Sequence, residues 1–367
     1  MKVLIACDKF KGSLDALGVC QAIAQGITAA RKETVCTLLP MADGGDGTLQ
    51  VLKSTLDLRT IEMPGTDALG RAIRVWYLSD GETAFLELAV ASGLAGLREE
   101  ERNPLHTQTV GTGRIIQHAL ETGHSKIVLG LGGSATNDAG MGLAYALGFQ
   151  FLDQEGKPFV PTGGNLSQIR QMIPPDPLPA AEFLILCDVD NPLYGPTGAA
   201  HTYGPQKGAN PQQVELLDQG LRHLAALIQA QFGREVAHIA GGGAAGGIAA
   251  GLSGLLPSVK MQSGFDYLQE LTGLEEKIAE ADWVITGEGK LDEQSLAGKV
   301  VGRMAELCRD SNKPLLAFVG RNELSQTQQQ KAGIRDIYEV MELTEDEKTA
   351  MASPGLLLTR LAYRAFF

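Results

Sequence analysis

The stretch that decides the fold is Asp282–Lys299, DWVITGEGKLDEQSLAGK. A short apolar run opens it, polar residues interleaved with glycine follow, and apolar residues then recur at helical spacing. The pattern predicts a buried strand, a flexible polar loop and a helix that Asp292 or Ser295 caps. Loops of this kind bind ligands at the carboxyl ends of strands in open α/β sheets. Glu288, Lys290 and Asp292 suit a metal-bound phosphate; the alternative is a surface loop with ordinary salt bridges.

Composition and net charge limit the classes of protein to which this chain can belong. The chain has 367 residues, of which 44% are hydrophobic and 20% charged, so we expect two well-packed domains and little disorder. The formal net charge of −12 argues against nucleic acid and acidic membrane surfaces as partners. A local basic pocket could still bind a small anionic substrate.

Cysteine usage and hydropathy point to a reduced compartment. The chain has five cysteines without a CxxC pair, and its histidines show no zinc spacing. The N-terminal apolar run is too short for a signal peptide, so we expect a cytoplasmic protein. Residues 239–256 are uncharged but contain seven glycines, which favours a glycine-rich loop followed by a tight helix over a membrane span.

The order of patterns predicts two domains. Val3–Ala6 and Val35–Leu39 are each expected to form a strand followed by a polar loop and a helix, with Ser13 capping the first helix. Alternating segments separated by turns then indicate antiparallel strands between residues 57 and 88. We therefore predict a parallel-sheet domain built from residues 1–57 and 262–367, with a mixed α/β domain inserted at 58–261. The active site is expected in the cleft between them.

Two polar loops follow the first two strands. In DKFKGS, Lys9 and Lys11 could hold a phosphate or carboxylate as point charges, or could simply be solvated. In MADGGDGT, Asp43 and Asp46 could hold Mg²⁺ or accept a hydroxyl proton, or could form an ordinary Asp-Gly turn.

The segment GLGGSATNDAG is the strongest predicted anion cradle. Its glycines follow a strand, and Ser134, Thr136 and Asn137 supply donors at an expected helix start, where phosphate groups bind. Asp138 could reach Mg²⁺. This segment matches GxGxxA and residues 241–246 match GxGxxG, each a weak dinucleotide signal. For the second segment, close helix packing explains the glycines equally well.

A further pair of carboxylates, Asp188 and Asp190, follows the expected strand Phe183–Cys187. One of them could be a general base, whereas the alternative is a turn at Asp190-Asn191-Pro192.

Taken together and in order, DKFKGS, ADGGDGT, GGSATNDAG, DVDNPL-GPTGAA, GAAGG and TGEGKLDEQSLAGK resemble the bacterial glycerate kinase family over essentially the whole chain. The resemblance implies an α/β fold: a flavodoxin-like parallel-sheet domain formed by both chain ends, with an inserted mixed α/β domain. It also implies transfer of the ATP γ-phosphoryl group to D-glycerate with Mg²⁺, usually giving 2-phosphoglycerate. A monomer or homodimer is expected.

Within that activity we assign roles as hypotheses. The catalytic residues are Asp190 as base, Asp46 as its reserve, and Lys290. The cradle for ATP phosphates consists of Gly132, Gly133, Ser134 and Asn137. The substrate ligands are Lys9, Lys11 and Ser295, and the Mg²⁺ ligands are Glu288, Asp292 and Asp138.

Two other classes stay open at this point. A nicotinamide-dependent oxidoreductase would use the GxGxxG-like strings and an acidic residue such as Asp266 for the ribose. A nucleotide or metabolite sensor could keep an enzyme fold without catalysis.

Overall fold

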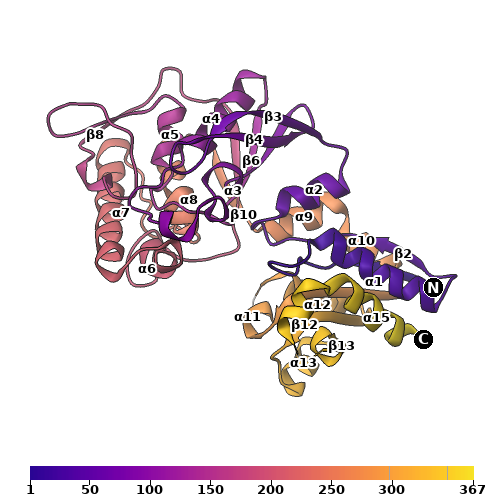
Figure 1. Ribbon diagram of the computed structural model, residues 1–367. Helices are drawn as coiled ribbons and strands as arrows, with labels where there is room; N and C mark the ends of the chain where they lie inside the picture. The colour runs from indigo at the N-terminus through magenta and orange to yellow at the C-terminus, as the bar shows by residue number, and fades with distance from the viewer. Residues whose placement is uncertain (297, 345) are drawn as a thin grey trace. The chain divides into compact units, whose positions relative to one another are not determined.

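The structure is a computed structural model that describes residues 1–296, 298–344 and 346–367. The chain forms two compact units. Unit 1 contains Met1–Asp57 and Ser263–Phe367, and unit 2 contains Leu58–Gln262. Figure 1 shows that the indigo and yellow ends of the chain both belong to unit 1.

Unit 1 alternates strands with helices. Its elements are β1 (Lys2–Ile5), α1 (Ala16–Ala30), β2 (Val35–Leu38), α2 (Thr48–Thr55), α9 (Gly264–Thr272), α10 (Leu274–Glu280), β11 (Trp283–Leu291), α11 (Glu293–Leu296), α12 (Val300–Asp310), β12 (Leu315–Asn322), α13 (Gln326–Ala332), β13 (Ile334–Glu339), α14 (Glu347–Ala352) and α15 (Pro354–Phe366).

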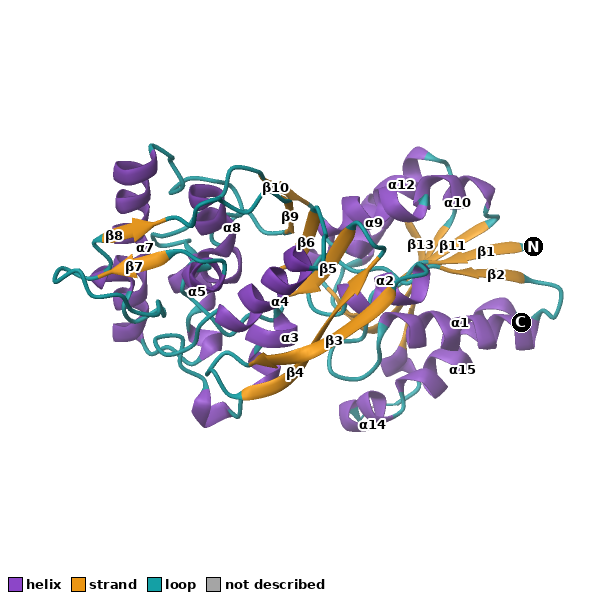
Figure 2. Cartoon of the chain, turned by 90° about the horizontal axis from the view of Figure 1, so that it is seen from above, coloured by secondary structure: helices purple, strands orange, loops and turns teal. Residues whose placement is uncertain are grey.

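The strands of unit 1 form one parallel sheet in the order β13-β12-β11-β1-β2. Counted along the chain within the unit, this is the order 2-1-3-4-5 of flavodoxin-like sheets. Figure 2 shows α1 and α15 along one face of the sheet and α10 and α12 along the other. The predicted fold class is therefore confirmed.

The helices α1 and α15 pack closely because small residues face each other. A Cβ on Gly26 would lie 2.3 Å from the carbonyl oxygen of Thr359. The core beneath this contact includes Ile5, Ile23 and Phe318, all fully buried. Both ends of the chain thus contribute to one core, which is what the predicted discontinuous domain requires.

The strand β11 is longer than the sequence indicated. The prediction of a polar loop directly after Ile285 is wrong, because β11 continues to pair with β12 as far as Leu291, which lies opposite Asn322. A Cβ on Gly287 would lie 2.2 Å from the Phe318 carbonyl oxygen, so this glycine permits close strand approach and does not mark a loop.

The first helix also starts differently from the prediction. Asp15, and not Ser13, is the N-cap of α1, and its carboxylate accepts a hydrogen bond from the Gly18 N–H at 2.7 Å. The Ser13 hydroxyl instead donates to the Phe10 carbonyl within the preceding loop. A carboxylate near the helix N-terminus is the more favourable cap because the helix dipole adds to the hydrogen bond.

Unit 2 is a mixed α/β unit. Its elements are β3 (Arg59–Thr66), β4 (Ala72–Ser79), β5 (Thr83–Glu87), α3 (Ala89–Ser92), α4 (Val110–Glu121), β6 (Lys126–Gly130), α5 (Met141–Ala146), β7 (Gln150–Leu152), β8 (Gln171–Ile173), β9 (Glu182–Leu186), α6 (Ala199–Tyr203), α7 (Pro211–Phe232), α8 (Ala244–Leu255) and β10 (Val259–Gln262).

The main sheet of unit 2 has the order β10-β9-β6-β5-β4-β3. Strands β3, β4 and β5 are antiparallel, as predicted for this region, and β5, β6, β9 and β10 are parallel. The loops that follow β6 and β9 therefore leave the same edge of the sheet. No helix in the described ranges combines the length and apolar character that crossing a membrane requires.

Candidate active site

The end of β1 and the middle of β11 bring two acidic residues together in unit 1. These strands pair with Ile5 opposite Ile285, and the ladder continues through a bond of 2.8 Å from the Asp8 N–H to the Gly287 carbonyl. In this register Asp8 lies opposite Glu288. The strand order reverses between β1 and β11, and such switch points are where sheets of this type bind ligands.

The carboxyl groups of Asp8 and Glu288 lie in surroundings that disfavour negative charge. Loss of solvation, followed by the nearby Asp43 carboxylate, raises the pKa of Asp8 to about 7, although Lys9 and Lys299 oppose the shift. Loss of solvation is also the main reason why the pKa of Glu288 rises to about 7. The Glu288 Oε1 atom is buried without a hydrogen-bond partner among the described residues. A bound cation would relieve this cost.

A Mg²⁺ ion fits the Asp8–Glu288 pair. No three His, Cys, Asp or Glu side chains of the described ranges are grouped so that they could hold a metal. Mg²⁺ in nucleotide-dependent enzymes, however, commonly needs only one or two carboxylates together with phosphate oxygens. The unpartnered Glu288 Oε1 offers such a ligand. Asp8 was not predicted from the sequence, although its position directly after the first buried strand was an available signal.

Asp292 and Ser295 hold each other at the turn after β11. The Asp292 carboxylate accepts hydrogen bonds from the N–H groups of Gln294 and Ser295 at 3.0 and 3.2 Å. The buried Ser295 hydroxyl donates to the Lys290 carbonyl at 3.2 Å and accepts from the Asp292 N–H at 3.1 Å. These hydrogen bonds fix the geometry of the turn, and the predicted roles of Asp292 and Ser295 stay predictions. The Lys290 ammonium lies 2.8 Å from the Glu323 carboxylate.

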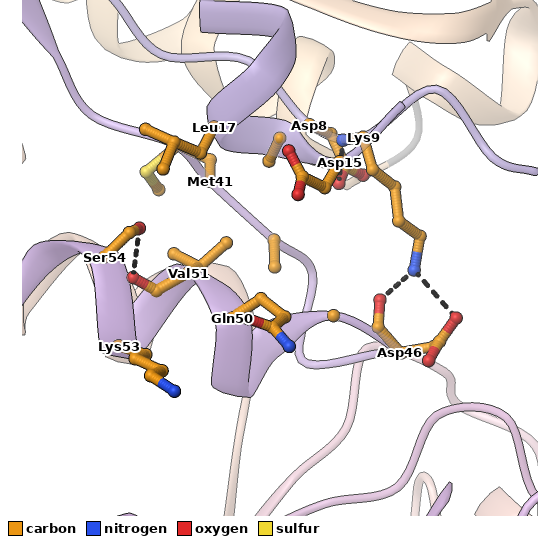
Figure 3. A pocket seen from close by; sticks show the side chains of 13 residues that line it. Asp8, Lys9, Asp15, Leu17, Met41, Asp46, Gln50, Val51, Lys53 and Ser54 are labelled. Atoms are coloured by element: carbon orange, nitrogen blue, oxygen red, sulfur yellow. Dashed lines mark hydrogen bonds and ion pairs between the residues drawn. The ribbon is translucent and has the colours of Figure 1, made fainter. Parts of the chain in front are cut away.

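Two other predicted residues, Lys9 and Asp46, line a cavity of about 290 Å³ in unit 1 (Figure 3). The Lys9 ammonium donates to the Asp46 carbonyl and lies 3.4 Å from its carboxylate. Asp8 lines the same cavity, whereas Lys11 is exposed outside it. The apolar part of the cavity lining includes Leu17, Met41 and Val51. The cavity thus gathers polar groups from three chain segments, and its Lys9 is already paired with Asp46.

In unit 2, the predicted anion cradle does not lie at a helix start. Helix α5 begins only at Met141 and has six residues, so Ser134 and Asn137 lie in the loop before it. The predicted contribution of a helix dipole to phosphate binding is therefore wrong. Gly133 is exposed and Gly132 partly exposed, whereas the rest of the loop is buried.

Asp138 stabilises this loop through hydrogen bonds that its carboxylate accepts. Its carboxylate is fully buried and accepts hydrogen bonds from the Thr109 N–H and hydroxyl at 2.9 and 2.7 Å. It also accepts from the N–H groups of Gly140 and Gly142 at 3.1 and 3.2 Å. Burial raises its pKa, and these bonds oppose the rise. Because its oxygens are occupied, Asp138 does not fit the predicted role of a Mg²⁺ ligand.

The two glycine-rich segments of unit 2 pack against each other. A Cβ on Gly246 would lie 2.2 Å from the Thr136 carbonyl oxygen, and one on Gly251 would lie 1.8 Å from the Ala139 carbonyl oxygen. Ala245–Gly247 have φ angles of 50°, 76° and 98°, so the regular part of α8 starts after them. Close packing therefore explains the GxGxxG match, as the alternative interpretation held.

The loop after β9 carries the predicted base, Asp190, which is exposed. Its neighbour Asn191 anchors the loop: the side-chain amide donates to the Thr197 carbonyl at 2.7 Å and accepts from the Tyr203 hydroxyl at 2.6 Å. The backbone of Asn191 also accepts a hydrogen bond from the Gly243 N–H at 2.8 Å. This anchoring fixes the backbone next to Asp190 but leaves its carboxylate accessible.

Lys207 is the residue of unit 2 that the sequence analysis missed. Its side chain is only 2% exposed, which is rare for a lysine. The ammonium donates to the Thr136 carbonyl at 2.6 Å and the Ser134 hydroxyl at 3.3 Å. A single lysine in the string GPQKGAN gives no periodic or spacing signal, so only the three-dimensional structure reveals the contact.

The fold and these sites define an α/β protein with a flavodoxin-like unit and an inserted mixed unit. A family model described as the glycerate kinase family matches residues 3–366, and the chain belongs to that family. It is 42% identical to a glycerate kinase of Haemophilus influenzae, over 87% of this chain and 86% of that protein. It is 38% identical to the glycerate 2-kinase of Escherichia coli, over 87% and 85%.

A solved structure is similar over the whole chain. The crystal structure of a protein provisionally assigned as glycerate kinase 2, from Salmonella typhimurium LT2, matches with a TM-score of 0.84 and 35% identity. The match covers 100% of this chain and 97% of the Salmonella chain. The resemblance expected from the sequence motifs is therefore confirmed.

Proposed function

We propose that this chain transfers the γ-phosphoryl group of ATP to D-glycerate and gives 2-phosphoglycerate. The observation that carries the proposal is the Asp8–Glu288 carboxyl pair at the switch point of unit 1, with an unpartnered Glu288 oxygen. Phosphoryl transfer depends mainly on positioning and charge neutralisation, which a cation held there would provide. The relatives named glycerate kinase and glycerate 2-kinase support the choice of acceptor and product.

The residues take the following roles in this proposal. Asp8 and Glu288 hold Mg²⁺, which when bound neutralises charge on the phosphate groups. Lys9 and Lys290 are the predicted cations of unit 1. To reach a ligand, Lys9 would have to leave Asp46, and Lys290 would have to leave Glu323 and Asp292. That loops of both units act on one bound nucleotide stays a prediction.

Phosphorus NMR tests the activity and the product together. With ATP, Mg²⁺ and D-glycerate, we expect ADP and a phosphomonoester whose proton coupling identifies 2-phosphoglycerate. The matched control uses L-glycerate. Formation of 3-phosphoglycerate would overturn the regiochemistry, and failure to form any phosphomonoester would overturn the activity. NADH titration followed by fluorescence checks the oxidoreductase alternative, for which the packed glycines of unit 2 leave no supporting observation.

Asp190 remains the proposed base, with Asp46 in reserve. The exposed Asp190 carboxylate can reach a hydroxyl group without breaking any anchoring contact of its loop. Asp190→Asn is expected to lower kcat by about 10²-fold or more, the usual contribution of a general base, with little change in the KM for ATP. Steady-state kinetics measures this effect, with Glu121→Gln as the control because Glu121 is an exposed carboxylate on α4. Turnover equal to that of the control removes Asp190 from the role.

A further inference from the structure

The loop after β6 in unit 2 carries a buried amide without hydrogen-bond partners among the described residues, and a buried ammonium group from the turn before α7 contacts the same loop. The loop follows β6, and Lys207 fixes it through the Thr136 carbonyl and the Ser134 hydroxyl. The next residue, Asn137, is fully buried, and both its Nδ2 and its Oδ1 lack hydrogen-bond partners among the described residues. These two observations are independent, since one concerns a charge and the other an unsatisfied amide.

Neither feature is explained by folding alone. Burial lowers the pKa of Lys207 to about 7, with the nearby Asp138 opposing the shift, so the folded chain holds this cation at a cost. An unpaired buried donor and acceptor on Asn137 add a further cost. The neighbouring Asp138 already ties the loop to α4 and α5 with four hydrogen bonds. The loop would therefore be anchored without either feature.

The unpaired amide, with one donor and one acceptor atom, favours a ligand that offers both an acceptor and a donor. A fully ionised phosphate group offers only acceptors and would leave the Asn137 Oδ1 unpaired. A hydroxy acid offers acceptors on its carboxylate and a donor on its hydroxyl, so it matches both amide atoms, whichever way the amide is turned. A cation nearby matches the charge of the carboxylate.

We propose that Asn137 binds the hydroxy-acid substrate, donating to its carboxylate and accepting from its hydroxyl, and that Lys207 is the positioning residue that holds the Ser134–Asn137 loop for this contact. The assignment rests on the proposed function and replaces the expected role of Asn137 as a ligand of ATP phosphates. The amide is fully buried, so water is excluded from this contact, which strengthens it.

Steady-state kinetics on the full chain tests the assignment with Asn137→Ala, Lys207→Met and Lys207→Arg. We expect Asn137→Ala and Lys207→Met to raise the KM for D-glycerate about 100-fold, the scale of a lost buried hydrogen bond to substrate, with the KM for ATP within about twofold of wild type. Lys207→Arg retains the charge and is expected to recover part of the affinity. Leu224→Ala, a core truncation in α7, is the control for general destabilisation.

The outcomes separate this inference from the proposed function. If the KM for ATP rises in place of that for glycerate, the loop binds phosphate and the inference fails. If both KM values stay at the level of the Leu224→Ala control while the melting temperature falls, Lys207 is only structural and the inference also fails. Calorimetric titration with D-glycerate and with propionate, which lacks the hydroxyl, is independent of turnover. Equal affinities for both acids contradict the hydroxyl contact even when the kinase activity is present.

Discussion

Glu288→Gln is expected to lower kcat by on the order of 10³-fold and to raise the Mg²⁺ concentration needed for activity, because it removes one of the two carboxylates proposed to hold the cation. The same change is expected to stabilise the metal-free protein above pH 7. The wild-type carboxyl titrates at about 7 when folded and near its ordinary, lower pKa when unfolded. A raised pKa in the folded state means that stability is fully present below the unfolded pKa and is lost as pH rises through 7.

The measurement is the free energy of unfolding by urea at pH 5 and pH 8 in the presence of EDTA. The glutamine variant should gain on the order of 1–3 kcal/mol relative to wild type at pH 8 and little at pH 5. Glu306→Gln, which removes an exposed ion pair with Arg303, is the control and should show no such dependence. A variant with normal turnover and no gain at pH 8 would show that Glu288 neither binds the cation nor has a raised pKa in the folded chain.

Gly246→Ala is expected to destabilise unit 2 strongly. The residue has φ +76°, and a Cβ there would meet the Thr136 carbonyl oxygen at 2.2 Å and the Asn137 Cα at 2.5 Å. The left-handed backbone costs about 1–2 kcal/mol for alanine, and the steric overlap with backbone atoms adds about 1–3 kcal/mol more. If Asn137 binds the substrate as proposed, its displacement should also weaken substrate binding.

Gly233→Ala is the matched control for this substitution. Gly233 ends α7 with φ +69°, and a Cβ there would have nothing within 4 Å. Alanine at this position therefore carries only the cost of the left-handed backbone, about 1–2 kcal/mol. Urea denaturation of both variants separates the cost of the left-handed backbone from the cost of the steric overlap. Equal losses of stability would mean that the glycine-rich segments do not need close packing. The GxGxxG match would then again favour a nucleotide-binding role.

Sequence reasoning located the loops of interest better than it assigned their residues. It placed β11 correctly at its start, but it took glycines as loop signals where the neighbouring β12 requires them for close approach. It selected Asp138 as a metal ligand because of its acidic side chain, although that side chain caps local N–H groups. Residue type shows which chemistry is available, whereas burial and partners decide whether that chemistry is free to act.

The sequence by itself determined the family, the alternation of strands and helices, and the assembly of one sheet from both chain ends, because hydrophobic periodicity and motif order are local properties of the chain. Only the tertiary structure decided that Asp8 lies opposite Glu288 and that Lys207 reaches the Thr136 carbonyl. Strand register and loop packing join residues some 280 and 71 positions apart. Their electrostatics therefore arise only when the chain is folded and water is removed from around the charges.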